Sequence, residues 1–422
     1  MSSEHKLPDR KAIIPADPRK ALSLPAEMVE RGLVLATKLE LKQRLQDCQT
    51  PLNQCPRSYN PATVSFSKNG EYALITAFGR AVSSPLLIIW NATDGWRTIA
   101  MMREQDREFV YSTVVSRNAE FALIGYGNGQ ILRWDIKNHR ASYLPIDGSD
   151  PHRRQRFILP IKVAPDRVIE DQRTYTDTTH PDSNQRDRMV TSMVLSPDER
   201  YFAECAQNVY VQIRESRSGR IHQRFHVGYV QYPHQIAFSH DGGKLVVARG
   251  QTTSRGGGMQ SLVTLFDLHG RRAPLTFAAD RIVAATAVAF FPDNQRVVSL
   301  ESGGVITVWN AQDGTEIRHW SHVKSPNAAN DLVSRRALSP NLIMEERNPM
   351  VWGLSGVAVS PDGERILTGG GDRFMRLWSP EGHQLFEYCH SARVVSVAFT
   401  PDGRRALSGC WDGVVCLWNL PP

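Results

Sequence analysis

Short runs of alternating apolar and polar residues recur along the chain, each time in the same order around one turn pattern. The turn consists of Ser or Thr (once Phe), then Pro or a polar residue, then Asp or Asn, then usually Gly. Pro presets φ at the first turn position, Asp can bond its own backbone and Gly accepts a positive φ, so the pattern is typical of a hairpin. Its seven copies begin at Ser67, Ser116, Ser196, Ser239, Phe291, Ser360 and Thr400.

Each turn lies between two runs that are typical of strands. In the last copy, the run 394–399 precedes the turn and the run 405–409 follows it. A third run ends on an aromatic residue in most copies, and a tight turn then leads into a fourth run such as 384–388. The third runs end at Trp90, Trp134, Ile213, Phe266, Trp309, Trp378 and Trp418.

Seven repeats of four short strands predict an all-β fold, a seven-bladed β-propeller. A single four-stranded blade cannot bury both faces of its sheet, whereas seven blades stacked around an axis can. The 422 residues are therefore expected to form one ring rather than several domains. Hydrophobic residues make up 41% of the chain, which is enough for a core of this size.

The last repeat resembles the WD40-repeat family. In that family, a His before the first strand, a Ser on the second, an Asp in the next turn and a Trp on the third form a hydrogen-bonded structural tetrad. The resemblance implies that the tetrad of this repeat consists of His390, Ser408, Asp412 and Trp418. Because the family's tetrad is structural, it says little about function.

The other repeats depart from the family pattern. The sixth keeps Thr368, Asp372 and Trp378 but offers no matching His, and the remaining repeats keep the aromatic residue and little else. The scarcity of these histidines looks similar to bacterial members of the family. The TolB-like propellers share the Ser-Pro-Asp-Gly turn, but the tryptophans of the third strands favour the WD40 kind.

The seventh repeat ends after its third strand, at Pro422. An open strand edge is a liability, and the resemblance implies that the N-terminal side of the chain supplies the missing fourth strand. Aligning Val64 with Val397 places that strand at about 48–56. The expected propeller therefore spans 48–422.

Residues 1–47 are expected to form an N-terminal arm. Residues 1–20 carry three prolines among charges, a composition typical of extended and poorly packed chain. Residues 26–46 mix apolar and charged positions, which fits a helix or an additional strand. Such a segment either packs against the propeller or presents itself to a partner.

All the long insertions fall on connections of one kind. In a WD40 blade, the connections from strand four to the next blade and from strand two to strand three emerge on the same face. The turns of the opposite face are short in this chain. Because loops on a rigid scaffold carry function, the insertion-bearing face is the candidate binding face. The insertions span 79–85, 145–187, 250–261 and 321–349.

Aromatic residues and Arg dominate the hot spots of protein interfaces. The alignment places several of them around the axis on the insertion-bearing face, as candidate partner contacts. Trp411 is the first of these to test, although packing over the blade edge would also explain it. The candidates are Phe109, Tyr126, Tyr232, Arg249, Arg373, Arg393 and Trp411.

The charge balance motivates one alternative, a nucleic-acid or nucleoprotein binder. Lys and Arg number 50 against 43 Asp and Glu, which gives a net charge of +7. The insertions contain cations such as Arg153 and Arg154, but also acids such as Asp166 and Glu170. This mixture argues against a simple stripe that follows phosphates.

The sequence contains no recognisable catalytic or metal-binding pattern. It has no phosphate-binding loop motif, no His/Cys cluster with zinc spacing and no Ser/His/Asp arrangement around a nucleophile elbow. We therefore expect no catalytic residues, no cofactor and no metal. An enzyme that uses the propeller axis as its site is the least favoured class.

The cysteines, the N-terminal residues and the lengths of the apolar runs indicate where the protein is located. None of the six cysteines forms a Cys-x-x-Cys pair, the first residues show no signal-peptide core, and no apolar run approaches the roughly 18 residues of a membrane helix. We expect a cytoplasmic propeller that is itself monomeric, without membrane contact. The leading function is a scaffold or adaptor that binds a protein partner through the insertion-bearing face.

Overall fold

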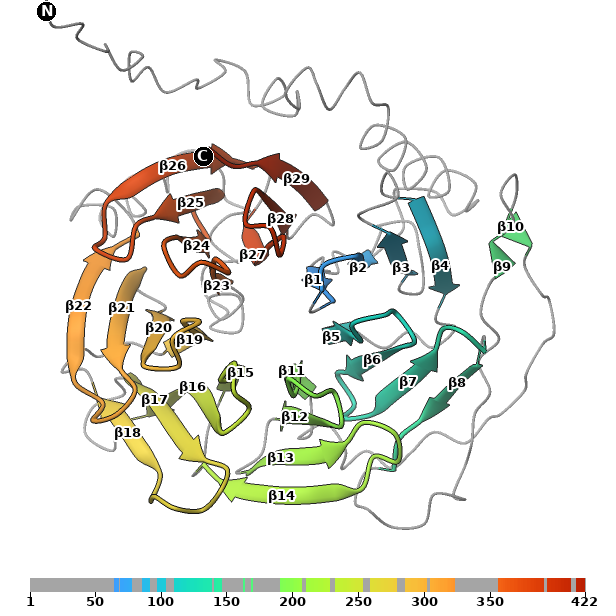
Figure 1. Ribbon diagram of the computed structural model, residues 1–422, viewed down its shortest axis with the longest axis horizontal. Helices are drawn as coiled ribbons and strands as arrows, with labels where there is room; N and C mark the ends of the chain where they lie inside the picture. The colour runs from blue at the N-terminus through green and yellow to red at the C-terminus, as the bar shows by residue number, and fades with distance from the viewer. Residues whose placement is uncertain are drawn as a thin grey trace, which may run out of the picture.

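The computed structural model describes the strands of a propeller and most of its short turns. Within the described residues every regular element is a β-strand, and the sheets are arranged around a central axis (Figure 1). The described residues are 64–67, 69–77, 86–91, 97–103, 110–138, 140–145, 162–163, 168–169, 190–206, 210–227, 232–252, 259–278, 285–301, 304–322, 356–390, 393–410 and 415–421.

The sheets confirm the predicted seven-bladed β-propeller. Six blades have four strands and the seventh has three among the described residues, and in each blade the strand order in the sheet follows the chain. The blades are: blade 1, β1 Val64–Phe66, β2 Tyr72–Ala77, β3 Leu86–Asn91 and β4 Arg97–Arg103; blade 2, β5 Val110–Val115, β6 Phe121–Tyr126, β7 Ile131–Asp135 and β8 Arg140–Tyr143; blade 3, β11 Val190–Leu195, β12 Tyr201–Ala206, β13 Tyr210–Glu215 and β14 Ile221–His226; blade 4, β15 Tyr232–Phe238, β16 Lys244–Thr252, β17 Met259–Asp267 and β18 Leu275–Ala278; blade 5, β19 Ala285–Phe290, β20 Arg296–Glu301, β21 Val305–Asn310 and β22 Glu316–Ser321; blade 6, β23 Val357–Val359, β24 Ile366–Gly369, β25 Phe374–Trp378 and β26 Gln384–Cys389; blade 7, β27 Val394–Phe399, β28 Arg405–Cys410 and β29 Val415–Asn419.

The core lies between neighbouring blades. Leu74 and Ile89 of blade 1 pack in one buried cluster with Ala122 and Trp134 of blade 2. The second and third strands of a blade are covered on both faces, so their residues are buried in near-continuous runs, as in Phe121–Tyr126. Burying one large apolar side chain contributes about 1.5–3 kcal/mol, and each blade contributes several to the seam with its neighbour.

A repeated polar contact joins the innermost strands. The side chain four positions before the turn accepts a backbone N–H bond from the next blade. Met193 N donates to Ser112 Oγ at 2.8 Å, and Ile236 N donates to Ser192 Oγ at 3.3 Å. Each of these serines follows a bulge in its strand, which directs its side chain toward the neighbouring blade.

The hairpin turns between first and second strands also contact one another around the ring. The Pro of one turn packs against the Gly of the next blade's turn, so that a Cβ at Gly242 would lie 3.3 Å from Pro197 and a Cβ at Gly363 would lie 3.3 Å from Pro292. These glycines have φ values of 74° and 78°, which a residue with a Cβ rarely adopts.

The ring closes through direct contact between blades 7 and 1. Val64 N donates to Ser396 Oγ at 3.3 Å, Gly70 lies against the ring of Pro401, and Ile75 shares a buried cluster with Leu407. The predicted outer strand of blade 7 at 48–56 and the predicted arm at 1–47 lie outside the described residues.

The structure changes the picture of two insertions. β16 and β17 are long strands whose pairing continues to Thr252 and Met259, so both ends of insertion 250–261 are strand rather than loop. Insertion 145–187 contains the hairpin of β9 (Lys162–Val163) and β10 (Val168–Ile169), and β9 lies against β4. Of insertion 321–349 only Ser321 and His322 are described, and residues 79–85 lie outside the described part.

Candidate functional site

The antiparallel blades define two faces of the ring. At one edge of each blade the second and fourth strands end and the first and third begin, as at Tyr126 and Val110 in blade 2. These edges together form what we call the insertion face, because the insertions attach there. The opposite turn face carries the hairpin turns between first and second and between third and fourth strands.

In blade 7 three of the four predicted tetrad residues come together. His390 Nε2 lies 2.7 Å from Ser408 Oγ, and Trp418 Nε1 donates to the same oxygen at 2.8 Å. His390 Nδ1 lies 3.2 Å from the carbonyl oxygen of Tyr388, which can only accept. The proton is therefore on Nδ1, and the Ser408 hydroxyl donates to Nε2. Asp412 lies outside the described residues.

Blade 6 corrects the expectation that its repeat lacks a His. His322, the residue after β22 of blade 5, places Nδ1 2.8 Å from Thr368 Oγ1 and Nε2 3.3 Å from Asp372 Oδ1. Trp378 Nε1 donates to Thr368 Oγ1 at 2.8 Å, so blade 6 has a complete set of four. The His was missed because insertion 321–349 separates it from the first strand of its blade. One signal would have found it: His322 directly follows a fourth strand, as His390 does.

Arg376 is a fifth member of the network in blade 6. The sequence pattern of the repeat does not point to it. Its Nη1 lies 2.6 Å from Asp372 Oδ2 and 2.6 Å from His322 Nε2. A guanidinium can only donate, so Nε2 is the acceptor and the proton of His322 is on Nδ1, where it bonds Thr368. The side chain of Arg376 is 7% exposed, which makes this a buried charged network.

The electrostatics of this network keep His322 neutral and Asp372 ionised. Burial lowers the pKa of His322, and the neighbouring guanidinium of Arg376 lowers it further. Burial alone would raise the pKa of Asp372, but the polar network around it, with the Arg376 guanidinium 2.6 Å from Oδ2, outweighs burial and lowers the pKa to about 2. The network is thus a neutral imidazole held between an anion and a cation.

The Ser or Thr hydroxyl that accepts the indole N–H of the third strand occurs in three neighbouring blades, 5, 6 and 7. In blade 5, Trp309 Nε1 donates to Ser299 Oγ at 2.8 Å. In blade 2 the equivalent strand position is Ile124, and the buried indole N–H of Trp134 has no protein partner. Among the described residues, this bond between an indole N–H of the third strand and a hydroxyl of the second strand is thus present in blades 5, 6 and 7.

Two arginines, the buried Arg214 and the half-buried Arg249, hold the points at which the chain leaves a blade on the insertion face. Arg214 of blade 3 donates to the carbonyl oxygen of Pro145, at the root of insertion 145–187, and also pairs with Glu204 at 3.1 Å. Burial raises the pKa of Glu204, against the opposing effect of the Arg214 guanidinium. Arg249 of blade 4 donates in the same way to the carbonyl oxygen of Val227.

The candidate contact residues do not share one environment. Arg373 is exposed, directly after Asp372, with a φ of 73°. Arg393 is half-buried at the start of blade 7. Arg249 is half-buried and bonded within the propeller, as described above. Tyr232 begins β15, where its backbone pairs with Gly250.

Tyr126 requires a correction. The sequence makes it a candidate contact residue on the insertion-bearing face, but β6 continues through it and its side chain is 1% exposed in the core between blades 1 and 2. Its ring lies 6.1 Å from that of Tyr143. Tyr126 is therefore a core residue and not a contact residue. Phe109 and Trp411 lie outside the described residues.

The described residues contain no group of three or more His, Cys, Asp or Glu side chains that could hold a metal ion. Over the same part of the chain, no helix has the length and apolar character needed to cross a membrane. Of the cysteines in that part of the chain, Cys205, Cys389, Cys410 and Cys416 form no disulfide.

Comparison with known proteins agrees with this geometry. The model of the WD domain, G-beta repeat, matches residues 347–379 and 382–419, which contain the strands of blades 6 and 7. The chain thus carries WD40 repeats within a seven-bladed β-propeller. Propellers of this family commonly act as protein-interaction scaffolds and are generally not catalytic.

One curated relative gives a more distant likeness. The chain is 27% identical over 135 residues to the cilia- and flagella-associated protein 52 of Chlamydomonas reinhardtii. The aligned part is 32% of this chain and 17% of that protein. The chain thus spans a small part of the relative's length.

Proposed function

We propose that the protein is a non-catalytic scaffold whose insertion face binds a protein partner. The observation that carries the proposal is the network under Arg373. The buried His322 contacts Thr368 and Arg376, and Arg376 donates to Asp372 at 2.6 Å, whereas the side chain of Arg373, the residue after Asp372, is exposed. A cation held on a rigid base loses little conformational entropy when it binds, which favours its use as an anchor.

The insertions support the same face. Arg214 holds the root of insertion 145–187, and the network around His322 holds the root of insertion 321–349. Both insertions therefore leave the ring from fixed points. Loops presented by a rigid scaffold are where binding residues concentrate.

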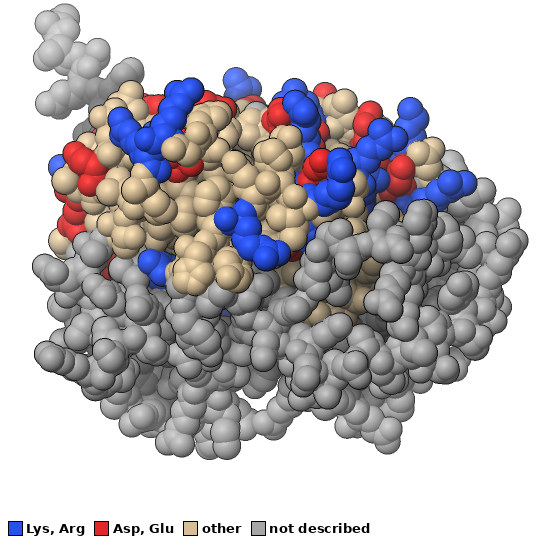
Figure 2. All heavy atoms as spheres, turned by 90° about the horizontal axis from the view of Figure 1, so that it is seen from below, with Lys and Arg blue, Asp and Glu red and all other residues tan. Residues whose placement is uncertain are grey.

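A protein partner is favoured over a nucleic acid because of the charge pattern. Figure 2 shows Lys and Arg interspersed with Asp and Glu over the described surface that it draws. Exposed cations are also paired, as Arg220 is with Glu215 at 3.0 Å. Nucleic-acid binding draws its affinity from Lys and Arg that neutralise phosphates, and would show a steep dependence on salt.

We place the protein in the cytoplasm, as a propeller that is itself monomeric. Buried Cys205 forms no disulfide, which is in keeping with a reducing compartment. Fractionation of the native cell tests the location, and sedimentation of the purified protein tests the monomer.

Affinity purification from native cells tests the binding face. Wild type should be compared with Arg373→Ala/Arg393→Ala on the insertion face and with Arg271→Ala/Arg272→Ala, two exposed arginines of the connection between β17 and β18 on the turn face. The proposal requires a stoichiometric protein partner that only the first variant loses, by about tenfold or more, at unchanged melting temperature. Equal recovery with all three proteins contradicts it. Recovery of nucleic acid instead of protein favours the alternative function.

A further inference from the structure

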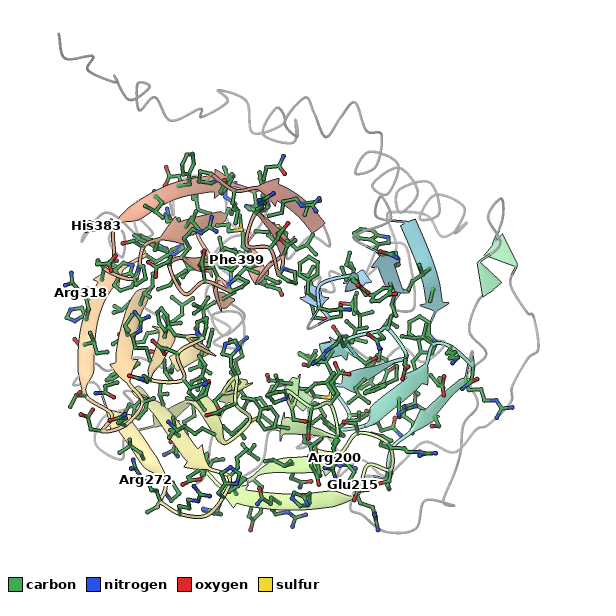
Figure 3. The ribbon with its side chains drawn as sticks, viewed as in Figure 1. Arg200, Glu215, Arg272, Arg318, His383 and Phe399 are labelled. Carbon is green, nitrogen blue, oxygen red and sulfur yellow. The ribbon has the colours of Figure 1, made fainter. Side chains whose placement is uncertain are left out.

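The seven turns between first and second strands share one backbone conformation. In each of them the N–H of the fourth residue donates to the carbonyl oxygen of the first, and the fourth residue has a φ between 50° and 78°. Figure 3 shows Phe399, directly before the turn of blade 7, on the inner side of its blade and Arg318 on the outer rim, in keeping with the inner position of the first strands. Because the backbones agree, the contacts between neighbouring turns depend on the side chains.

At two seams a hydrogen bond joins one turn to the next. The backbone N–H of Arg117 in blade 2 donates to Oε1 of Glu199 in blade 3 at 2.6 Å. In the same way, the N–H of His240 in blade 4 donates to Oδ1 of Asn294 in blade 5 at 2.6 Å. The donor is each time the second residue of its turn, and the acceptor belongs to the fourth residue of the following turn. One polar side chain thus binds the backbone of the preceding blade.

At four other seams the same two positions hold a proline and a glycine. An added Cβ at Gly242 would lie 3.3 Å from Cδ of Pro197, and at Gly70 it would overlap the ring of Pro401. Proline has no N–H to donate, so an acceptor in the following turn would find no partner there. The absence of a side chain instead leaves room for the proline ring. The four pairs are Pro197–Gly242, Pro292–Gly363, Pro361–Gly403 and Pro401–Gly70.

The seam between blades 1 and 2 is of another kind. Its fourth turn residue is Ala119, which has no acceptor and is 6% exposed in the apolar cluster that the two blades share. Lys68, the second residue of the preceding turn, lies outside the described residues. At each of the other six seams, a turn that offers an N–H is followed by an acceptor, and a turn with proline is followed by glycine.

Each kind of pair is disrupted when only one of its members is changed. A Cβ in place of the glycine crowds the proline ring, and a left-handed φ is itself unfavourable for most residues that carry a Cβ. Conversely, a proline opposite Glu199 or Asn294 removes the N–H that these side chains bind and brings a ring toward their Cβ. The two positions are therefore interdependent, although 82 residues separate Arg117 from Glu199.

We propose that these two turn positions form a matched pair that decides which blade can follow which. A blade with proline at the second position of its turn accepts a neighbour with glycine at the fourth position. A blade with an N–H at the second position selects a neighbour with Glu or Asn there. The pairs act as a conformational device of the turn face, which favours the native order of the blades over misassembly, a characteristic failure of repeat proteins.

Exchange of the pair type at two seams of the full-length chain tests the proposal. Between blades 4 and 5, His240→Pro and Asn294→Gly are made singly and together, which converts a hydrogen-bonded pair into a proline–glycine pair. Between blades 3 and 4, Pro197→Ala and Gly242→Asn make the opposite exchange, because Asn tolerates a left-handed φ. His240→Ala/Asn294→Gly is the matched control, since it keeps the N–H but loses the acceptor. Thermal unfolding measures every variant.

The expected result is that the second change of each pair reverses its sign. Asn294→Gly should lower the melting temperature of wild type by about 2–4 °C but raise that of His240→Pro. Pro197→Ala should likewise destabilise wild type but raise the melting temperature of Gly242→Asn. The control should melt no higher than Asn294→Gly. Losses that simply add in either double variant overturn the proposal, whether or not the insertion face binds a partner.

Discussion

His322 and Thr368 lie 46 residues apart in the chain, yet Nδ1 of one is 2.8 Å from Oγ1 of the other. The bond crosses the seam from blade 5 to blade 6 and links the start of insertion 321–349 to the second strand of the blade that follows it. Thr368 also accepts the indole hydrogen of Trp378 at 2.8 Å, so one hydroxyl serves two donors from different blades.

Thr368→Val should destabilise the propeller by about 1–3 kcal/mol. The substitution keeps the shape of the side chain but leaves two buried donors without an acceptor, and an unsatisfied buried group costs about that much. Thr276→Val, at an exposed position of β18, should change the free energy of unfolding by less than about 0.5 kcal/mol. Urea unfolding measures both, and equal effects would mean that the shared hydroxyl has no special role.

His322 should make stability fall in mild acid. Because burial lowers its pKa below the ordinary value of 6.5, the unfolded chain takes up a proton at higher pH than the folded chain. Its contribution is therefore complete above pH 6.5 and is lost as the pH falls below that value, by at most about 1.4 kcal/mol per pH unit for one proton. Urea unfolding between about pH 7.5 and 5.5 measures the slope.

His322→Asn should reduce that slope, whereas His383→Asn, at an exposed turn of the same region, should leave it unchanged. If the slope persists in His322→Asn, another group titrates. The carboxylate of Asp372 contributes only at much lower pH. Its pKa of about 2 lies below the ordinary value of 3.8, so its stabilisation is lost as the pH falls from about 4 toward 2.

Gly70→Ala should weaken the closure of the ring. A Cβ at Gly70 would overlap the ring of Pro401, and the φ of 66° adds backbone strain. Gly270 is a matched control because it has a φ of 67° and no atom near the position of a Cβ. Gly270→Ala should cost about 1–2 kcal/mol from φ alone. Thermal unfolding should show a clearly larger loss for Gly70→Ala, and equal losses would contradict the contact between the two turns.

Arg214→Met should destabilise by about 3–5 kcal/mol because it leaves the buried carboxylate of Glu204 unpaired. The double variant Arg214→Met/Glu204→Met should recover a large part of that loss, since both charges are then removed from the interior of blade 3. A double-mutant cycle in urea measures the coupling. Additive effects would show that the two side chains do not stabilise each other.

The expected closing strand can be tested by truncation. Removing residues 1–47 keeps the predicted strand at 48–56, whereas removing residues 1–59 deletes it and exposes the edge of β29. The longer deletion should melt several degrees lower than the shorter one, since 1 kcal/mol shifts the melting temperature by about 2–4 °C in a large domain. Equal melting temperatures would mean that 48–56 does not close blade 7.

The fold could be read from the sequence because the information is local. Turn residues such as those from Ser360 to Gly363 specify the hairpin themselves, and Trp418 lies at a fixed distance from its own turn. The tetrad contacts of His390 could be foreseen for the same reason, since no insertion separates it from blade 7.

The remaining features depend on distance and register. His322 could not be assigned to blade 6 from the sequence because a long insertion separates it from the first strand of that blade. The length of an insertion does not tell where in space the chain leaves and re-enters the ring. Tyr126 was misplaced because one extra residue of strand moves a side chain from a turn into the core. The pairing of Arg214 with Glu204 follows from their positions on neighbouring strands of one blade, which composition does not encode.

The bond between Ser396 and Val64 is of the same kind as the bond between Ser112 and Met193, although the first joins the last blade to the first and the second joins blades that are consecutive in the chain. The seam between blades 7 and 1 thus uses the same side-chain-to-backbone bond and the same Pro–Gly turn contact as other joints of the ring. The order of the blades is therefore circular rather than linear. A circular permutant whose new ends lie between blades 3 and 4, with residues 1 and 422 joined by a linker, should fold to the same propeller.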